Sequence, residues 1–440
     1  MRKSNTDIID HLREFVMIDK VADKYKSRPA DFTRNRILPF KLLVIFMLRK
    51  LYKNLSLEIS EFFKELSGPK VSLTNLSLTK SAFTQARQKL SPLFFRDLLY
   101  KFNDEFYTNN DQRVRLVKSM RILAVDATTL DLPYTHELAQ VYGTHSNQHK
   151  HVRYIKGRAS VMYDLLNGMI VDGVLQPFAE GEPKAALKHL AVGQAGDLVV
   201  YDRNYASFEM VYQHSQRNMH VLMRLRSSFS SQVEAFAQSC QDDIVVLIKP
   251  GRNTPLKEKA YGRNDSIPVR LLKFTLDNGQ VALLLTTLLD KEEFPIAVLK
   301  QIYRMRWAVE TRYDLLKNVL SVESFSGLTQ IAIEQDFYIS LFLMNMQSLL
   351  ADELEDELNN RYGHRKHKYQ VNLATAIGHL KKSVVELFIL KDTQEILFEL
   401  KEAFLKHVEP VRPNRKYARE KDKYLRRKKP ILIKNRRNVL

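Results

Sequence analysis

The chain has 440 residues, of which 45% are hydrophobic and 27% charged, so it is too long for one simple domain and typical of a globular protein. A single cysteine, Cys240, excludes a disulfide scaffold and a multi-cysteine zinc or iron–sulfur site. The 69 Lys and Arg residues exceed the 50 Asp and Glu residues and leave a net charge of +19. This surplus favours a polyanionic partner, usually nucleic acid.

No targeting or membrane segment is expected. The N-terminus lacks the apolar run of a signal peptide, and the longest apolar runs, such as Leu42–Leu48, are too short to span a bilayer. We therefore expect a cytoplasmic protein without a membrane partner.

Residues 1–115 have helical periodicity, with apolar residues at three and four spacing through Phe40–Leu48 and again from Ile59. Residues 81–90 read as a short helix with Arg87 and Lys89 exposed. The pattern fits a compact helical DNA-binding domain, and it fits a plain helical bundle equally well.

The periodicity changes near residue 119, where buried strands alternate with helices. The expected order is three strands, a helix, a strand, a helix and a strand, and Asn167-Gly168 predicts a hairpin turn. This is the order of a ribonuclease-H-like α/β core, assigned to residues 116–226. The expected elements are 121–126, 160–166, 169–175, 183–190, 197–202, 207–217 and 220–225.

The rest of the chain divides into three further segments. Residues 227–300 are expected to form a β-rich insertion, with a turn at Asp277-Asn278-Gly279. Residues 301–405 return to helix and complete the core. Residues 406–440 hold 14 Lys or Arg and three acidic residues, which predicts a weakly structured basic tail that contacts phosphates. A solubilising tail is the alternative.

Two aspartates follow buried strands. Asp126 and Asp202 each end an apolar run, and the two strands are neighbours in a ribonuclease-H-like sheet. Phosphoryl transfer on nucleic acid requires carboxylates that converge on divalent cations, and this placement suits that chemistry. Taken alone, each aspartate is better explained as the cap or turn residue that often ends a strand.

Four functional groups share one stripe of a helix predicted to run from Pro295 past Lys317. At about 100° per residue, Tyr303, Arg306, Glu310 and Lys317 fall within an arc of about 60°. Glu310, flanked by Tyr303, Arg306 and Lys317, suits a metal ligand with phosphate contacts around it. Arg306 and Glu310 are also an i,i+4 pair, so an ion-paired solvent face fits the same spacing. Trp307 within this helix is expected to pack in the core.

Tyr303-x2-Arg306-x3-Glu310-x6-Lys317 matches the Y-R-E-K signature of the DDE transposases of the insertion-sequence-four group, which the chain resembles from about residue 30 to 330. The context of Asp126 resembles the first aspartate block of that family, and Asp202-Arg203-Asn204-Tyr205 resembles its Asp-Arg-Gly-Tyr block. Asn204 replaces the usual Gly and tolerates the same left-handed backbone. The 108 positions from Asp202 to Glu310 leave room for the family's β insertion.

The resemblance implies Asp126, Asp202 and Glu310 as catalytic ligands of two Mg²⁺ ions, for which Mn²⁺ substitutes. It also implies that Tyr303, Arg306 and Lys317 contact phosphates of the transposon end. A basic loop around His145, His149 and His151 adds further phosphate contacts, and a zinc site there is the weaker alternative. The expected DNA-binding residues are Tyr303, Arg306, Lys317, Arg203, Tyr205, Lys156 and Arg158.

The expected function is a DNA transposase that cleaves transposon ends and transfers the 3′-OH into target DNA. Its partners are the terminal inverted repeats and the target duplex, held in a homodimeric synaptic complex on the bacterial nucleoid. One alternative is a ribonuclease-H-like nuclease or resolvase without strand transfer. The other is a catalytically inactive DNA-binding descendant.

Overall fold

A computed structural model describes residues 4–33, 37–51, 53–67, 78–108, 113–146, 153–275, 279–390 and 392–412. These residues form two compact units. The helical unit comprises residues 1–113, 131–156 and 314–440, and the sheet unit comprises residues 114–130 and 157–313. Among the described residues, every helix is too short or too polar to cross a membrane.

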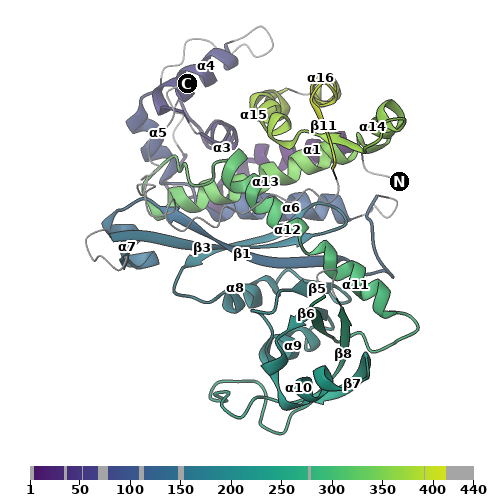
Figure 1. The fold of residues 1–440 in the computed structure, drawn as a ribbon. Helices are drawn as coiled ribbons and strands as arrows, with labels where there is room; N and C mark the ends of the chain where they lie inside the picture. Colours follow the sequence, from purple (N-terminus) through teal and green to yellow (C-terminus); the bar gives the residue numbers. More distant parts are fainter. Residues whose placement is uncertain are drawn as a thin grey trace. The chain divides into compact units, whose positions relative to one another are not determined.

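The sheet unit is organised around a mixed sheet (Figure 1). Within this unit, neighbouring strands follow the order β3-β1-β5-β6-β9-β8-β7, and β4 pairs with β3. The pairs β1/β5 and β5/β6 are parallel, whereas β3/β4, β6/β9, β8/β9 and β7/β8 are antiparallel. The strands are β1 (Ile122–Leu132), β3 (Arg153–Asp164), β4 (Ile170–Pro177), β5 (Leu198–Tyr201), β6 (His220–Leu225), β7 (Asp243–Ile248), β8 (Ile267–Thr275) and β9 (Val281–Thr286).

The predicted strand and helix order is present, with α8 (Glu182–His189) and α9 (Phe208–Ser215) as the two helices. The turn at Asn167-Gly168 is confirmed, because Gly168 joins β3 to β4 with φ of +71°. The helix α7 (His136–Tyr142) and the short strand β2 (His145–Ser146), which pairs with the start of β3, occur between β1 and β3.

The central strands are buried on both faces, as their continuous apolar runs require. Leu123 and Val125 of β1 contribute to a core that includes residues of α8, α9 and α10 (Ser231–Gln238). The alternate residue Ile122 joins a second core with Leu299 and Ile302 of α11 (Ile296–Met305). Side chains alternate along a strand, so even-numbered positions of β1 face the side that holds α11.

A buried ion pair fixes the register of β1 against β5 at their starting end. Arg121 donates from Nε to Asp197 Oδ1 at 2.8 Å and from Nη2 to Oδ2 at 2.6 Å. The side chains are 7% and 3% exposed. A bidentate guanidinium–carboxylate pair is directional, so it opposes a slip between the strands.

The predicted β-rich insertion extends the main sheet. β9 pairs with β6, and β8 and β7 continue outward from it. The segment also contains η1 (Ser227–Phe229) and α10. Asp277 and Asn278 of the predicted turn lie outside the described residues, and Gly279 has φ of +79°.

The helical unit joins helices from both ends of the chain. The helix α13 is buried along most of its length and packs against α3, α6 and α15, while α1 packs against α6, α15 and α16. The helices are α1 (Asn5–Met17), α2 (Asp19–Tyr25), α3 (Phe40–Leu48), α4 (Leu55–Leu66), α5 (Lys80–Arg87), α6 (Leu93–Tyr107), α13 (Gln330–Asp352), α14 (Glu355–Tyr362), α15 (Leu373–Ile389) and α16 (Thr393–Leu405).

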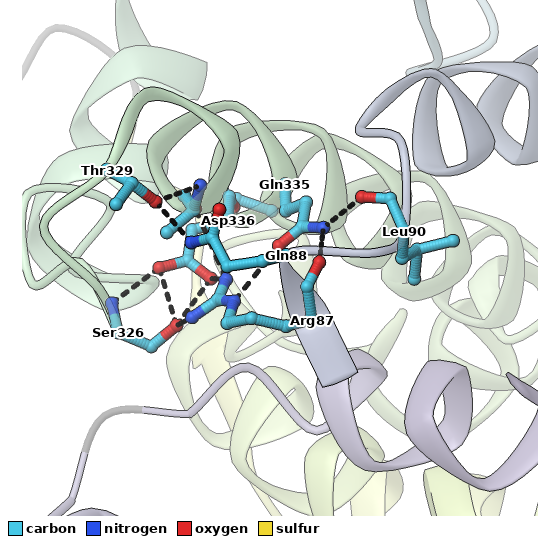
Figure 2. A network of polar contacts seen from close by, with 9 residues as sticks. Arg87, Gln88, Leu90, Ser326, Thr329, Gln335 and Asp336 are labelled. Carbon is cyan, nitrogen blue, oxygen red and sulfur yellow. Dashed lines mark hydrogen bonds and ion pairs between the residues drawn. The ribbon is translucent and has the colours of Figure 1, made fainter. Parts of the chain in front are cut away.

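Arg87 was expected on an exposed helix face, and this expectation is wrong. Its side chain is 2% exposed and lies in a polar network at the start of α13 (Figure 2). Arg87 donates to Ser326 Oγ at 2.7 Å and to Gln335 Oε1 at 3.0 Å, and it is 3.3 Å from Asp336 Oδ1. A buried guanidinium requires such partners, so Arg87 joins α5 to α13.

The predicted basic tail begins with regular structure. Val408–Pro410 forms β11, which pairs antiparallel with β10 (Tyr369–Val371). Residues 413–440, which hold most of the tail's charge, lie outside the described residues.

Candidate active site

Asp126 lies in β1 and Asp202 directly follows β5. The pairing of β1 with β5 matches Ile122 with Leu198 and Ala124 with Val200, an offset of 76 positions. Continued beyond the paired residues, this offset brings Asp126 level with Asp202, and adjacent strands are about 4.8 Å apart. Ile122 and Leu198 belong to the core that includes α11 residues. Asp126 and Asp202 follow these two residues by an even number of positions, so alternation along the strands assigns them to the same face of the sheet. The parallel pair therefore brings two carboxylates to one edge of the sheet, on the α11 side.

The segment that carries Tyr303, Arg306, Glu310 and Lys317 is an interrupted helix, which corrects the expectation of a continuous one. α11 ends at Met305, α12 (Ala308–Asp314) follows after Arg306 and Trp307, and a π-helical turn, η2, spans Leu315–Val319. The angular positions expected for one regular helix, at about 100° per residue, therefore do not apply to these four residues. Lys317 belongs to the helical unit, whereas the other three residues belong to the sheet unit.

Arg306 connects three of the predicted site residues. Its Nη2 donates to Glu310 Oε1 at 3.2 Å, and its Nη1 is 3.9 Å from Asp126 Oδ2. Burial raises the pKa of the nearby Tyr303, the Arg306 guanidinium lowers it, and the charge of Asp202 raises it. The guanidinium is 8% exposed, so in this structure it lies between acidic side chains and is turned away from solvent.

The environment of Asp126 disfavours a charged carboxylate. Burial raises the pKa of Asp126 to about 6, against the opposing effects of the Ala127 amide and the Arg306 guanidinium. The charges of Glu310 and Glu182 raise it further. Asp126 Oδ1 accepts the amide of Ala127 at 2.8 Å. The site therefore holds more negative charge than Arg306 neutralises.

Two buried polar atoms near Asp126 have no hydrogen-bond partner among the described residues, namely the Tyr205 hydroxyl and Arg306 Nε. Burial raises the pKa of Tyr205, and the charge of Asp126 adds to this shift. Orphaned polar atoms beside excess carboxylate charge fit a site that takes up a hydrated cation. The carboxylate groups of this site are hard oxygen ligands of the kind that Mg²⁺ prefers. Within the described ranges, however, no three His, Cys, Asp or Glu side chains already converge on one point.

The expected DNA-binding residues fall into different environments. Arg203 is exposed, as a phosphate contact requires. Tyr205 is only 1% exposed, so its side chain does not reach the surface in this structure. Arg158 donates to Glu182 Oε1 at 2.5 Å and lies over the ring of Phe178.

In the helical unit, Lys156 Nζ is 4.0 Å from Asp131 Oδ1. His149 and His151, on which the predicted phosphate loop and the weaker zinc alternative depended, lie outside the described residues.

Trp307 was expected to pack in the core, and this expectation is also wrong. Its side chain is 57% exposed, at the break between α11 and α12. The Arg306 guanidinium lies 5.1 Å from the centre of its ring. An exposed indole beside Arg306, which contacts Glu310, offers a flat surface for a ligand with a π face.

Sequence reasoning missed four buried residues that contact the backbone of Asp126 directly or through a chain of hydrogen bonds. They are Ser160, Asp172, His189 and Tyr313. Their spacing along the chain matches no catalytic motif, and three of them lie in elements whose apolar pattern alone predicted a strand or a helix. Only the folded sheet brings them together.

Asp126 lies within β1, Asp202 follows the adjacent parallel strand β5, and Arg306 contacts Glu310. Carboxylates on rigid elements are what metal-dependent enzymes that act on nucleic acid require. Comparison with protein families identifies the family of this chain. The family described as "Transposase DDE domain" matches residues 118–346, more than half of the chain. The chain belongs to this family.

Two curated relatives are transposases of insertion sequence elements from Bacillus thuringiensis subsp. berliner. The chain is 21% identical over 326 residues to that of IS231B, covering 64% of this chain and 66% of the relative. It is 21% identical over 311 residues to that of IS231C, covering 61% and 63%. The chain thus spans slightly less than two thirds of these relatives.

A solved structure, the piggyBac transposase synaptic complex with hairpin DNA, overlaps 96% of this chain and 89% of its own at 11% identity. Its TM-score of 0.45 is too low to support a conclusion.

Proposed function

We propose that the protein is a DNA transposase that cleaves the ends of its element and joins the freed 3′-OH to target DNA. The observation that carries the proposal is the β1/β5 register, whose offset brings Asp126 level with Asp202 when it is continued past Ala124 and Val200. The contacts of Arg306 with Asp126 and Glu310 support it. Membership of the DDE transposase family supports it. In-line phosphoryl transfer needs such carboxylates on rigid elements, and no covalent protein–DNA intermediate is required.

We assign the sheet core to the ribonuclease-H-like class. The order β4-β3-β1-β5-β6, with parallel β1/β5 and β5/β6 pairs, supports this assignment. Active residues at the carboxyl ends of adjacent parallel strands are the general expectation for an α/β sheet. The strands β9, β8 and β7 then represent the family's insertion, joined to the core sheet at β6.

Asp126, Asp202 and Glu310 are the proposed ligands of two Mg²⁺ ions, with Mn²⁺ as a substitute. The bound ions would make the attacking oxygen a better nucleophile and stabilise the leaving one. Asp126 and Asp202 supply oxygen donors from the sheet, while Glu310 approaches from α12. Bound cations would compete with Arg306 for the carboxylates of Asp126 and Glu310, and the guanidinium would then be available to a phosphate.

We place the chain in the insertion-sequence-four group on the Y-R-E-K spacing. Tyr303, Arg306 and Lys317 then contact phosphates of the transposon end, together with exposed Arg203 and with Lys156 and Arg158. Arg158 would exchange its ion pair with Glu182 for a phosphate. Tyr205 is left out of this group because it is buried.

The proposed partners are the terminal inverted repeats and target DNA, bound by a homodimer on the nucleoid in the bacterial cytoplasm. The net charge of +19 supports a polyanionic partner. Much of that charge lies in residues 406–440, which suit sequence-independent attraction to phosphates.

The test compares Glu310→Gln with Glu293→Gln, which changes an exposed glutamate of the same unit. Purified variants are assayed for binding of end DNA and for Mg²⁺-dependent cleavage. We expect Glu310→Gln to bind normally and not to cleave, and Glu293→Gln to behave as the wild type. Full cleavage and strand transfer by Glu310→Gln contradict the assignment.

A pre-cleaved end with a free 3′-OH separates the alternatives. Joining of this end to a target plasmid supports a transposase, whereas cleavage without joining identifies a nuclease or resolvase. Failure of the wild type to nick a plasmid that carries the element's ends identifies an inactive DNA-binding descendant.

A further inference from the structure

The backbone carbonyl oxygen of Asp126 accepts hydrogen bonds from two hydroxyl groups. The Ser160 hydroxyl of β3 is 3.2 Å away, and the Tyr313 hydroxyl of α12 also donates to it. All three residues belong to the sheet unit. A carbonyl oxygen has two lone pairs, so both are engaged. The main chain of Asp126 is thereby attached to two elements other than its own strand.

The Ser160 contact continues into a buried chain. Ser160 Oγ is 2.9 Å from His189 Nε2, and His189 Nδ1 is 2.7 Å from Asp172 Oδ2. The Ser–His–Asp order is that of a hydrolase triad, but Ser160 and His189 are 0% exposed and Asp172 is 3% exposed. A substrate cannot reach a nucleophile at that depth. The chain instead joins β3, the end of α8 and β4 to the backbone of Asp126.

The Tyr313 contact connects Asp126 to the helix that carries Glu310. Tyr313 lies three residues after Glu310 in α12, and its hydroxyl also accepts the amide of Val161 at 3.0 Å. Burial raises the pKa of Tyr313, so the hydroxyl keeps its proton and remains a donor. The strand of Asp126 and the helix of Glu310 are therefore held together by a buried, neutral donor.

We infer that Tyr313 and the Ser160–His189–Asp172 chain are positioning residues that set the distance between the carboxylates of Asp126 and Glu310 for a divalent cation. The inference rests on the proposed function. A metal site tolerates displacement of its ligands by only about 0.5 Å, so anchoring the main chain of a ligand matters. Residues that orient metal ligands typically change affinity about 10–100-fold when removed.

The experiment uses the full chain and Mn²⁺, whose binding is followed by electron paramagnetic resonance. Tyr313→Phe removes one hydroxyl and leaves the ring. Tyr261→Phe is the matched control, because Tyr261 is 5% exposed and donates to Glu209 at 2.7 Å in the same unit. We expect Tyr313→Phe to bind Mn²⁺ about 10–100-fold more weakly, and Tyr261→Phe to bind it as the wild type does.

Thermal unfolding without metal separates positioning from stability. A structural role alone predicts that the two variants lose similar stability and keep the same Mn²⁺ affinity, and that result overturns the inference. Ser160→Ala provides the second test if Tyr313→Phe does not fold, with Ser215→Ala as its control, since Ser215 Oγ donates to the Val211 carbonyl in α9.

Asp202→Asn distinguishes this inference from the proposed function. If Asp202→Asn weakens Mn²⁺ binding and Tyr313→Phe and Ser160→Ala do not, only the positioning role fails. If Asp202→Asn also leaves Mn²⁺ binding unchanged, the proposed metal site itself fails.

Discussion

The two ends of the β1/β5 pair carry opposite charge arrangements. At the starting end, Arg121 neutralises Asp197 through two short hydrogen bonds. Asp126 and Asp202 lie five positions after Arg121 and Asp197, and the β1/β5 offset, continued past its last pair Ala124/Val200, brings these two acidic residues level. Like charges on adjacent strands destabilise a sheet. The Arg121–Asp197 pair stabilises the register, and that register holds the acidic Asp126 and Asp202 near each other despite their repulsion.

The comparison shows which carboxylate is less completely neutralised by a cation. Asp197 has its cation at 2.6 Å, whereas the guanidinium nearest Asp126 is 3.9 Å away and also contacts Glu310. An arrangement that costs stability is expected where function requires it. The following predictions test this contrast, beginning with the largest expected effect.

Asp202→Asn removes one carboxylate from the acidic end. Loss of a metal ligand forfeits several kcal/mol of transition-state stabilisation, and about 4 kcal/mol corresponds to roughly a thousandfold loss of rate. We expect a single-turnover cleavage assay on end DNA to register a loss of at least this size. Asp242→Asn, at an exposed position of the same unit, serves as the control and should cleave normally. Equal rates for the two variants contradict the role of the acidic end.

Arg121→Met removes the cation from the neutral end and leaves Asp197 buried without its charge partner. Breaking one partner of a buried ion pair costs about 3–5 kcal/mol, so the free energy of unfolding should fall by that amount. Urea unfolding followed by circular dichroism measures it. Replacing both residues, as Arg121→Met with Asp197→Leu, should recover much of the loss. A single variant within 1 kcal/mol of the wild type would mean that the pair does not stabilise the register.

Asp126→Asn tests the charge at the acidic end through pH. The folded-state pKa of about 6 lies above the ordinary value of 3.8, so ionisation of Asp126 opposes folding. The stabilisation from its proton is fully present below about pH 4 and is lost as the pH rises through about 6. Relative to the wild type, Asp126→Asn should therefore gain stability between these values, by at most about 3 kcal/mol. Thermal unfolding in EDTA measures the difference, and a constant difference across this range contradicts the prediction.

Trp307→Ala tests whether the acidic end faces nucleic acid. Stacking of a base on an aromatic side chain contributes about 1–3 kcal/mol, so the affinity for end DNA should fall by that amount. Leu247→Ala, at an exposed residue of β7, should leave it unchanged. Trp307 is the only tryptophan of the chain, so its fluorescence should respond when DNA binds. An unchanged spectrum and affinity exclude contact with DNA.

The part of the fold that local patterns determine could be predicted from the sequence. Apolar runs such as 198–201 form strands because burial on both faces requires them, and the chain places Asp202 directly after one. The spacing of Arg306 and Glu310 also predicted their contact, since i and i+4 positions adjoin even across the helix break.

The remaining features depend on long-range packing, which leaves no periodic signal. Arg87 is buried because Gln335 and Asp336, almost 250 positions away, satisfy its guanidinium. Trp307 is exposed because α11 ends one residue before Arg306, and the apolar pattern did not indicate that break. The contacts of Ser160 and Tyr313 with Asp126 likewise exist only once the sheet has formed.

Localised backbone cleavage by Fe²⁺ most directly tests the claim that the acidic end of the β1/β5 pair binds the catalytic ions. Fe²⁺ replaces Mg²⁺ in the intact protein, and ascorbate with peroxide then generates radicals that cut the chain beside the bound ion. The account predicts cuts near Asp126 and Asp202, suppressed by excess Mg²⁺ and absent in Asp202→Asn. Cuts only at other positions, or cuts near Asp126 that persist unchanged in Asp202→Asn, would contradict it.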